Sequence, residues 1–496
     1  MNKRKNFIIS SLATLLLLVS CSSNDIIFER YSYDVIDKDF RQTWTDGNVS
    51  QLGYYKSLRY VNGSEQTEYI ESYDELYRSQ NYLHKMNSTG NSKMLVIPVD
   101  FADYTCDRLA HGCPLSRTLI QNAFFGKESR TQYESVASYF DKSSYGKLKI
   151  DGKVTDWFRP SVTYADLQNP STNKTIVVNI YKEALAWYQN KYGDLASYYV
   201  NGDPNQGLPI YFIYSAPADD SPNGPNTPLW AYTFNSEALV SWTSFSMLNL
   251  DTYNKVDSHT LIHETGHLLG LDDYYATNGN YSPTGHIDMM DYSIGDETAF
   301  SKMLLDWIRP IRVEKSITYS LTPFESTGNV LLLNKNWNES AMDEYILLEY
   351  YTPTGLNEKD SKSINVEAKL PTKPGLKVYH VDSRAGFFEN KIKPVGYLKD
   401  GGKSKENYRV GIVHSNSVSP GNEYTKYPLY QLLEKDGGNS FMSGGIASND
   451  SLWHEGDTFG ETTFVDYKFH SGEDLGITFK VDKITSEFLT LTITYK

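Results

Sequence analysis

The sequence predicts an α/β domain with a mixed sheet and one central helix, followed by an antiparallel, β-rich, sandwich-like C-terminal domain. Apolar runs of strand length precede an amphipathic helix at residues 257–269. After residue 310, short alternating segments are separated by Gly, Asn and Pro, which is typical of antiparallel sheets. The length of 496 residues allows two or three domains.

Each element follows from its local pattern. In the first domain, residues 93–310, we expect strands at 95–101, 148–154 and 210–214. In the second domain, residues 311–496, we expect strands at 316–321, 345–350, 377–381, 475–481 and 488–494. Two segments rich in Gly, Ser and charge, 399–407 and 437–448, are expected to be exposed loops.

The central helix has recognisable ends. Asp257 or Ser258 can cap its first turn. Gly270 ends it, because glycine tolerates the left-handed conformation that turns the backbone sharply. An apolar stripe on the helix is expected to pack on a core and comprises Leu261, Ile262, Leu268 and Leu269.

This helix contains a metal-binding pattern. His263 and His267 are four residues apart and share a helix face, while Glu264 points toward the open side of the ion. After the turn at Gly270, Asp273 can fold back as a third ligand. Two imidazoles and one carboxylate leave a fourth position for water, so the pattern predicts a catalytic zinc site.

These residues resemble the metzincin metallopeptidases, whose motif runs HExxHxxGxx followed by His or Asp. The family also has a methionine turn beneath the metal, and the segment 285–292 follows at a suitable distance. The resemblance assigns Met290 to that turn and Tyr292 to a position near the metal. The family spacing selects Asp273 over its neighbour Asp272. Glu297 as third ligand, in a thermolysin-like arrangement, leaves the turn and the methionine unexplained.

Further segments are similar to the immune inhibitor A group of metzincins, peptidase family M6. The similar segments are 94–101, 135–140, 144–148, 300–307 and 375–382, and together they span most of residues 93–390. The resemblance implies a metzincin-like catalytic domain. Asp306 departs from the glycine expected at its position, which leaves the loop after that helix in doubt.

The predicted function is a zinc-dependent endopeptidase. Glu264 would act as general base while zinc lowers the pKa of a water that attacks a peptide carbonyl. Two alternatives use the same residues differently. In the first, a surface adhesin or binding lipoprotein keeps the metzincin scaffold without its catalysis, although such a protein would not need Glu264. In the second, a metal hydrolase uses the same residues to cleave a non-peptide amide.

The N-terminus predicts export. A basic start at residues 2–5 precedes an apolar run at 7–19 that is too short to span a bilayer, and the ending at Cys21 resembles a bacterial lipobox. The resemblance implies that residues 1–21 are a lipoprotein signal peptide, with lipidation of Cys21 and anchoring to the outer face of the bacterial cytoplasmic membrane. Residues 22–92 are expected to be an extension or a propeptide-like region.

The remaining cysteines are Cys106 and Cys113. In an oxidising compartment they can form a short-loop disulfide. A zinc site that also uses His111 is the alternative, but it lacks a fourth ligand.

The formal net charge of −14 disfavours nucleic acid as a partner. We expect protein or peptide substrates and a monomer. The family resemblance also suggests structural calcium at acidic loops that include Asp203, Asp219 and Asp220, against the simpler interpretation of a solvated acidic surface.

Overall fold

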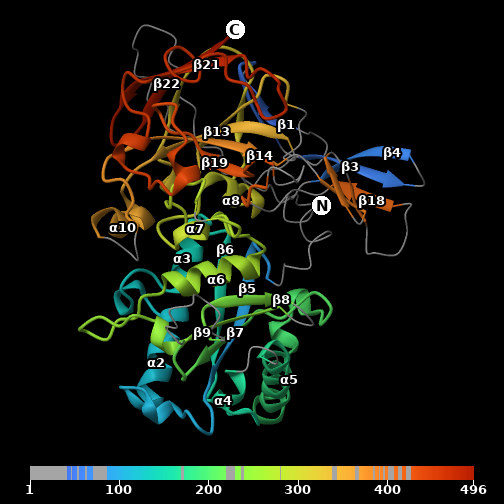
Figure 1. Cartoon of the computed structure of the whole chain (residues 1–496), viewed down its shortest axis with the longest axis vertical. Coiled ribbons are helices and arrows are strands. Elements are labelled where there is room, and N and C mark those ends of the chain that lie inside the picture. The colour runs from blue at the N-terminus through green and yellow to red at the C-terminus, as the bar shows by residue number, and fades with distance from the viewer. Residues whose placement is uncertain are drawn as a thin grey trace, which may run out of the picture.

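The structure is a computed structural model. It describes residues 42–45, 47–52, 55–61, 64–70, 86–168, 173–218, 229–235, 239–279, 281–337, 343–363, 368–383, 386–389, 391–394, 397–399, 407–410, 416–419 and 426–496. An α/β part lies below a β-rich part in Figure 1, and helix α6 (His259–Leu269) lies in the α/β part on the side that faces the β-rich part.

Five strands form the sheet of the α/β part, in the order β6-β5-β7-β9-β8. The first four are parallel, and the edge strand β8 is antiparallel to β9. Their bounds are β5 Gly90–Val99, β6 Leu148–Val154, β7 Ile210–Tyr214, β8 Tyr232–Asn235 and β9 Leu239–Ser244. The strands expected at 148–154 and 210–214 are confirmed with these bounds, and the one expected at 95–101 begins and ends earlier.

Helices cover both faces of this sheet. The side chains of each strand point alternately to the two faces, so each strand contributes to both cores. In β5, Met94 and Val96 face the core shared with α2, α3 and α6, whereas Leu95 and Ile97 face the core shared with α5. The other helices are α2 Gly112–Phe125, α3 Val136–Ser143, α4 Tyr164–Leu167, α5 Asn173–Tyr192, α7 Met289–Tyr292, α8 Ala299–Leu304, α9 Phe324–Thr327 and α10 Glu358–Lys362.

The β-rich part contains two main sheets that enclose a core. Their orders are β1-β2-β10-β12-β13-β14-β19 and β11-β22-β21-β20, and all neighbouring strands are antiparallel except β10 and β12. The bounds are β1 Gln42–Thr45, β2 Val49–Leu52, β10 Ile311–Val313, β11 Ile317–Leu321, β12 Val330–Leu333, β13 Glu344–Tyr351, β14 Gly375–Asp382, β19 Tyr430–Leu432, β20 Thr458–Phe459, β21 Ile477–Ile484 and β22 Leu489–Tyr495. The expected combination of an α/β part and a β-rich part is thereby confirmed.

Six further strands form two smaller sheets, in the orders β17-β18-β3-β4 and β15-β16. Their bounds are β3 Tyr55–Val61, β4 Ser64–Ile70, β15 Gly386–Glu389, β16 Lys391–Pro394, β17 Tyr397–Lys399 and β18 Asn407–Val410.

Strands β12, β13 and β14 of the seven-stranded sheet are buried on both faces. In β13, Ile346 and Leu348 face the four-stranded sheet, while Tyr345 and Leu347 pack into the core that contains α6. This position explains why six of the eight residues of β13 are aliphatic or aromatic. The strands β1 and β2 precede the α/β part in sequence but extend this sheet through β10. The boundaries near residues 92 and 310 stay predictions.

Asp306 adopts φ 59° in the loop after α8. This is the left-handed conformation that glycine adopts without strain and that aspartate tolerates better than most residues. The departure from the expected glycine therefore keeps the same turn. Within the part of the chain that the structure describes, none of the helices has the length and apolar character needed to cross a membrane.

Candidate metal centre and active site

The helix α6 ends where the sequence predicts. Gly270 adopts φ 100°, and its N–H bonds back to the carbonyl of His267 at 3.0 Å. Because this left-handed residue reverses the chain direction, Asp273 returns to the helix. The expected first residue, 257, is two residues early, since α6 begins at His259, whose N–H donates to Asp257 Oδ1.

The donor atoms of three predicted ligands converge. Asp273 Oδ1 lies 3.1 Å from His263 Nε2 and 3.3 Å from His267 Nε2. Ligand atoms around a tetrahedral zinc ion at about 2.0–2.1 Å are about 3.3 Å apart. The observed spacing therefore fits a divalent ion, and the imidazole–carboxylate donor set suits one chemically.

Backbone carbonyls orient both imidazoles. His263 Nδ1 donates to the carbonyl of Met289 at 2.8 Å, and His267 Nδ1 donates to that of Leu271 at 2.8 Å. A hydrogen on each Nδ1 leaves each Nε2 with its lone pair free for a metal ion. The predicted methionine turn thus fixes the orientation of the His263 ring through its backbone.

Met290 packs directly under α6. Its side chain is fully buried, and a Cβ built on Gly266 would meet its sulfur at 2.4 Å. Asp288 Oδ1 accepts a hydrogen bond from the Met290 N–H at 2.6 Å and so caps this turn. The close approach requires glycine at position 266, between Glu264 and His267.

Glu264 is held by the edge strand β8. Thr233 Oγ1 donates to Glu264 Oε2 at 2.6 Å and lies 2.8 Å from Ser241 Oγ, while Ser241 Oγ donates to the backbone carbonyl of Glu264 at 3.2 Å. Burial raises the pKa of the Glu264 carboxyl, although both histidines and Thr233 oppose that shift. A raised pKa makes this carboxylate a stronger proton acceptor than an ordinary one.

The charges of the cluster depend on one another. Burial disfavours a charged imidazole at His267, but Asp273 and Glu264 outweigh it and raise the pKa of His267 to about 10. Burial also disfavours ionised Asp273, but His267 and His263 more than offset it and lower the pKa of Asp273 below its usual range. The carboxylate of Asp273 and the two imidazoles therefore stabilise opposite charges on each other.

The alternative ligands lie elsewhere. Neither Asp272 nor Glu297 belongs to the converging group. Burial raises the pKa of Asp272 to about 7, and burial together with Asp288 and Asp296 raises that of Glu297 well above its usual range.

His259, the other histidine on α6, binds two carboxylates. Its Nδ1 contacts Asp257 at 2.5 Å, and its Nε2 contacts Asp360 of α10 at 3.1 Å. Its ring also stacks on Tyr133 at 4.1 Å. His259 therefore bridges two carboxylates and does not belong to the converging group.

Two tyrosines differ in their relation to the cluster. Tyr292, which the resemblance assigns to a position near the metal, stacks on His286 at a ring distance of 3.7 Å. Tyr275 lies close to Asp273, and burial together with the Asp273 charge raises the Tyr275 pKa. The sequence does not distinguish Tyr275 from the other tyrosines, and only its position two residues after Asp273 could have indicated it.

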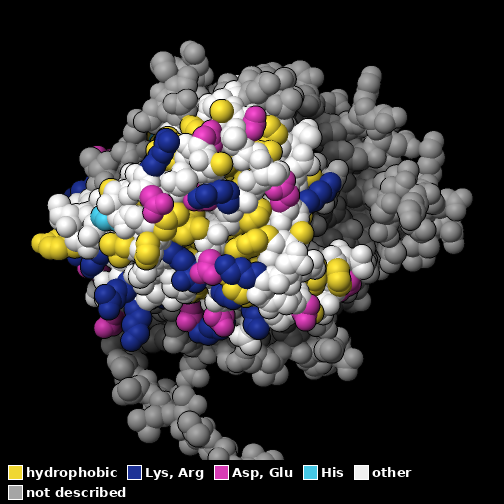
Figure 2. Space-filling model, turned by 90° about the horizontal axis from the view of Figure 1, so that it is seen from below, with side chains coloured by type: hydrophobic (Ala, Val, Ile, Leu, Met, Phe, Trp, Pro, Cys, Tyr) yellow, Lys and Arg dark blue, Asp and Glu magenta, His cyan; other side chains and the backbone are white. Residues whose placement is uncertain are grey.

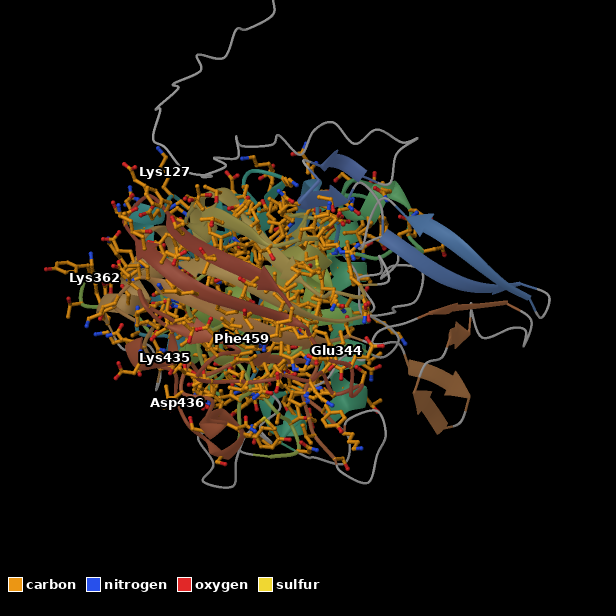
Figure 3. All side chains as sticks on the ribbon, turned by 90° about the horizontal axis from the view of Figure 1, so that it is seen from above. Lys127, Glu344, Lys362, Lys435, Asp436 and Phe459 are labelled. Carbon is orange, nitrogen blue, oxygen red and sulfur yellow. A yellow bond between two sulfur atoms is a disulfide. The ribbon has the colours of Figure 1, made fainter. Side chains whose placement is uncertain are left out.

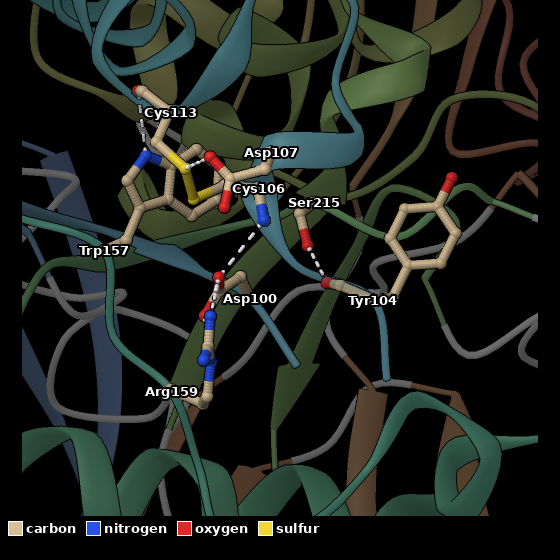
Figure 4. The surroundings of a disulfide bond; sticks show 8 residues. All are labelled: Asp100, Tyr104, Cys106, Asp107, Cys113, Trp157, Arg159 and Ser215. Atoms are coloured by element: carbon tan, nitrogen blue, oxygen red, sulfur yellow. Dashed lines mark hydrogen bonds and ion pairs between the residues drawn. A yellow bond between two sulfur atoms is a disulfide. The ribbon is translucent and has the colours of Figure 1, made fainter. Parts of the chain in front are cut away.

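Cys106 and Cys113 form a disulfide between the 3-10 helix Cys106–Arg108 and the start of α2. Figure 4 shows how the bridge is supported. Asp100 accepts the N–H of Cys106 at 3.1 Å and pairs with Arg159, while Trp157 Nε1 donates to the carbonyl of Cys113 at 3.0 Å. The bridge therefore joins the 3-10 helix to α2, and Asp100 links both to the end of β5.

Cys21, Asp219 and Asp220 lie outside the described residues. The Asp203 carboxylate accepts hydrogen bonds from Asn205 and Gln206, and calcium there stays a prediction. The face seen from below in Figure 2 intersperses basic, acidic and hydrophobic side chains.

A stretch of 238 residues is 23% identical to immune inhibitor A of Bacillus thuringiensis subsp. alesti, covering 39% of this chain and 34% of that protein. The chain is distantly similar to immune inhibitor A. It spans about a third of the length of that relative, and the match agrees with the resemblance seen in the motifs. No family model matches the chain.

Two crystal structures of OgpA from Akkermansia muciniphila also align with it. One is a catalytically inactive form in complex with an O-glycopeptide substrate, glycodrosocin, and the other is the wild type. They share 14% and 13% identity over 60% of this chain and 85% of theirs, with a TM-score of 0.22 in both cases. A TM-score this low does not establish a common fold.

Proposed function

We propose that the protein is a zinc-dependent endopeptidase of the metzincin type that cleaves extracellular proteins. The supporting observation is the approach of Asp273 Oδ1 to the Nε2 atoms of both His263 and His267, next to the buried carboxyl of Glu264. Met290 under the helix adds to this support.

The residues divide the work as follows. His263, His267 and Asp273 would hold zinc, which supplies Lewis acidity and lowers the pKa of a water molecule toward neutrality. Glu264 takes a proton from the attacking water and delivers it to the leaving amine. Thr233 donates a hydrogen bond to Glu264 Oε2. This bond fixes the plane of the carboxyl group and leaves its second oxygen available for proton transfer.

The edge strand β8 suits a peptide substrate. In the described part of the chain, β8 pairs only with β9, so its outer edge can accept an extended peptide next to Glu264. We also propose anchoring of the mature enzyme to the outer face of the bacterial cytoplasmic membrane through Cys21, on the basis of the N-terminal pattern.

The test compares zinc content with cleavage of a diverse peptide library, read by mass spectrometry. Glu264→Gln should keep zinc and lose at least about a hundredfold in turnover, because it lacks the general base. Asp273→Ala should lose zinc. Glu461→Gln, at an exposed carboxylate, serves as the matched control. Full turnover by Glu264→Gln would contradict the assigned role, and no cleavage by zinc-loaded wild type would favour the binding lipoprotein.

A further inference from the structure

A second cluster of metal-type donors lies in the β-rich part. It comprises Glu344, His380 and His470, and one donor atom from each lies within 4.8 Å of the others. Figure 3 looks onto the β-rich part and labels Glu344 among its strands. None of these residues belongs to the cluster on α6, and no sequence motif joins them.

The register of the central sheet brings the first two together. Glu344 opens β13 and lies directly opposite Asp382 at the end of β14, while His380 lies opposite Ile346. Because residues two apart on a strand share a face, Glu344, His380 and Asp382 lie on one face. Ile346 and Val378 show that this face meets the four-stranded sheet.

A loop then brings the third donor over this end of the sheet. His470 precedes β21, and its backbone N–H donates to Glu344 Oε1, while the N–H of Ser471 donates to Glu344 Oε2 at 3.0 Å. The loop backbone is therefore fixed on the carboxylate, and the His470 ring is placed beside it.

The spacing of the donors matches that of the cluster on α6. Glu344 Oε1 lies 2.9 Å from His380 Nε2 and 3.6 Å from His470 Nδ1. These distances bracket the separation of about 3.3 Å between ligands of a tetrahedral zinc ion. The side chains of His380 and Glu344 are 1% and 2% exposed and that of His470 is 19% exposed, so an ion can enter from the His470 side.

The ring of His380 is oriented as a metal-binding ring is. His380 Nδ1 lies 2.9 Å from the hydroxyl of Tyr467, which directs Nε2 into the cluster. The ring of His470 stacks on Tyr427 at 4.1 Å. Asp382 Oδ2 lies 2.9 Å from His470 Nδ1 and adds a second carboxylate, so that the surroundings favour a dication.

We propose that Glu344, His380 and His470 bind a second divalent transition-metal ion, which fastens the loop before β21 to the end of the seven-stranded sheet. Two imidazoles and a carboxylate suit Zn²⁺. Without an ion, the same atoms form a hydrogen-bonded cluster, and metal content distinguishes the two states. Bound metal would stabilise the fold by mass action.

The test uses the full chain with His263→Ala and His267→Ala, so that the outcome is independent of the proposed peptidase activity. The protein is freed of metal with a chelator, exposed to a small excess of Zn²⁺ and desalted, and its zinc is counted by mass spectrometry. We expect one equivalent. Adding His470→Ala should remove it, whereas adding His454→Ala, at a histidine of the same part that binds the carbonyl of Asn449, should not.

Retention of less than about a tenth of an equivalent by the double variant would overturn the proposal, as would retention of the full equivalent after His470→Ala. If His470→Ala does not fold, Glu344→Gln replaces it. Co²⁺ absorption of the double variant alone gives an independent readout, because a visible band of four- or five-coordinate cobalt is expected and an aquo-ion spectrum would refute the site.

Discussion

Replacing Gly266 with alanine tests the packing of the methionine turn under α6. An ideal Cβ at this position would lie 2.4 Å from the sulfur and 3.1 Å from Cε of Met290, while its next neighbour, Leu271 Cδ1, is at an ordinary 3.8 Å. The strain therefore falls on one side chain. Met290 is fully buried, so its sulfur cannot move toward solvent.

Two effects of opposite sign set the magnitude. Overpacking a buried contact costs about 1–3 kcal/mol, and replacing glycine in a helix interior gains up to about 1 kcal/mol. Gly266→Ala should therefore destabilise the protein by up to about 3 kcal/mol. In a Met290→Ala background the sulfur is gone, so the same substitution should be neutral or stabilising by up to about 1 kcal/mol.

A double-mutant cycle measures this change of sign. The melting temperatures of the wild type, both single variants and the double variant are compared at equal zinc occupancy, with near-ultraviolet circular dichroism as the probe. We expect Gly266→Ala to lower the melting temperature of the wild type but not that of Met290→Ala. Equal losses in both backgrounds would refute the contact between Gly266 and Met290.

Three further predictions follow from single contacts. Thr233→Val should lower kcat roughly ten- to hundredfold, as expected for a lost hydrogen bond to a charged group, whereas Thr233→Ser should retain the hydrogen bond. Steady-state kinetics checks this, with KM expected to stay unchanged. Equal losses of kcat in the two variants would contradict the prediction. Burial opposes the charge on His259, but Asp257 and Asp360 raise its pKa to about 9. Because the ordinary pKa of histidine is 6.5, the raised pKa stabilises the fold by roughly 3 kcal/mol below pH 6.5, and this contribution is lost as the pH rises through 9. His259→Gln should therefore flatten the decline of the melting temperature between these pH values. An unchanged slope would contradict the prediction. The Cys106–Cys113 bridge closes a loop with a separation of 7 residues, so replacing both cysteines with serine should lower the free energy of unfolding by on the order of 2–3 kcal/mol. Denaturant unfolding measures this, with the reduced wild type as control. Identical unfolding midpoints for the oxidised wild type and the double serine variant would contradict the prediction.

The features that the sequence predicts are local ones. The spacing of His263, His267 and Gly270 determines a helix face and its turn, and both are present as expected. Strands such as β6 and β7 are bounded by short-range patterns, so their ends were predictable.

The features that the sequence misses depend on contacts between distant residues. Thr233 reaches Glu264 across 31 residues, and Asp360 reaches His259 across 101. Glu344 and His380 meet only because β13 and β14 pair in one register, and a shift of one residue would place them on opposite faces. No spacing within a helix or a strand encodes such pairs.

The burial of strands β12, β13 and β14 on both faces makes the two parts of the molecule dependent on each other. Tyr430 of β19 donates to Thr298 Oγ1 at 2.9 Å, and Thr298 donates to Asp288 Oδ2 at 2.6 Å. Asp288 in turn accepts the N–H of Met290. A chain of hydrogen bonds thus runs from the seven-stranded sheet to the turn that packs against α6, inside one continuous apolar core.

A chain that ends at residue 310 would expose that core and leave Thr298 without its donor. We expect this truncated chain to bind a hydrophobic dye, to lack near-ultraviolet circular dichroism and to retain less than one equivalent of zinc. The full chain purified in parallel should not bind the dye, should show near-ultraviolet circular dichroism and should retain at least one equivalent of zinc. A folded, zinc-loaded fragment that cleaves peptides would show that the β-rich part is an accessory domain. Because strands β12, β13, β14 and β19 all contribute side chains to the core beneath α6, the structure favours a catalytic unit that needs them.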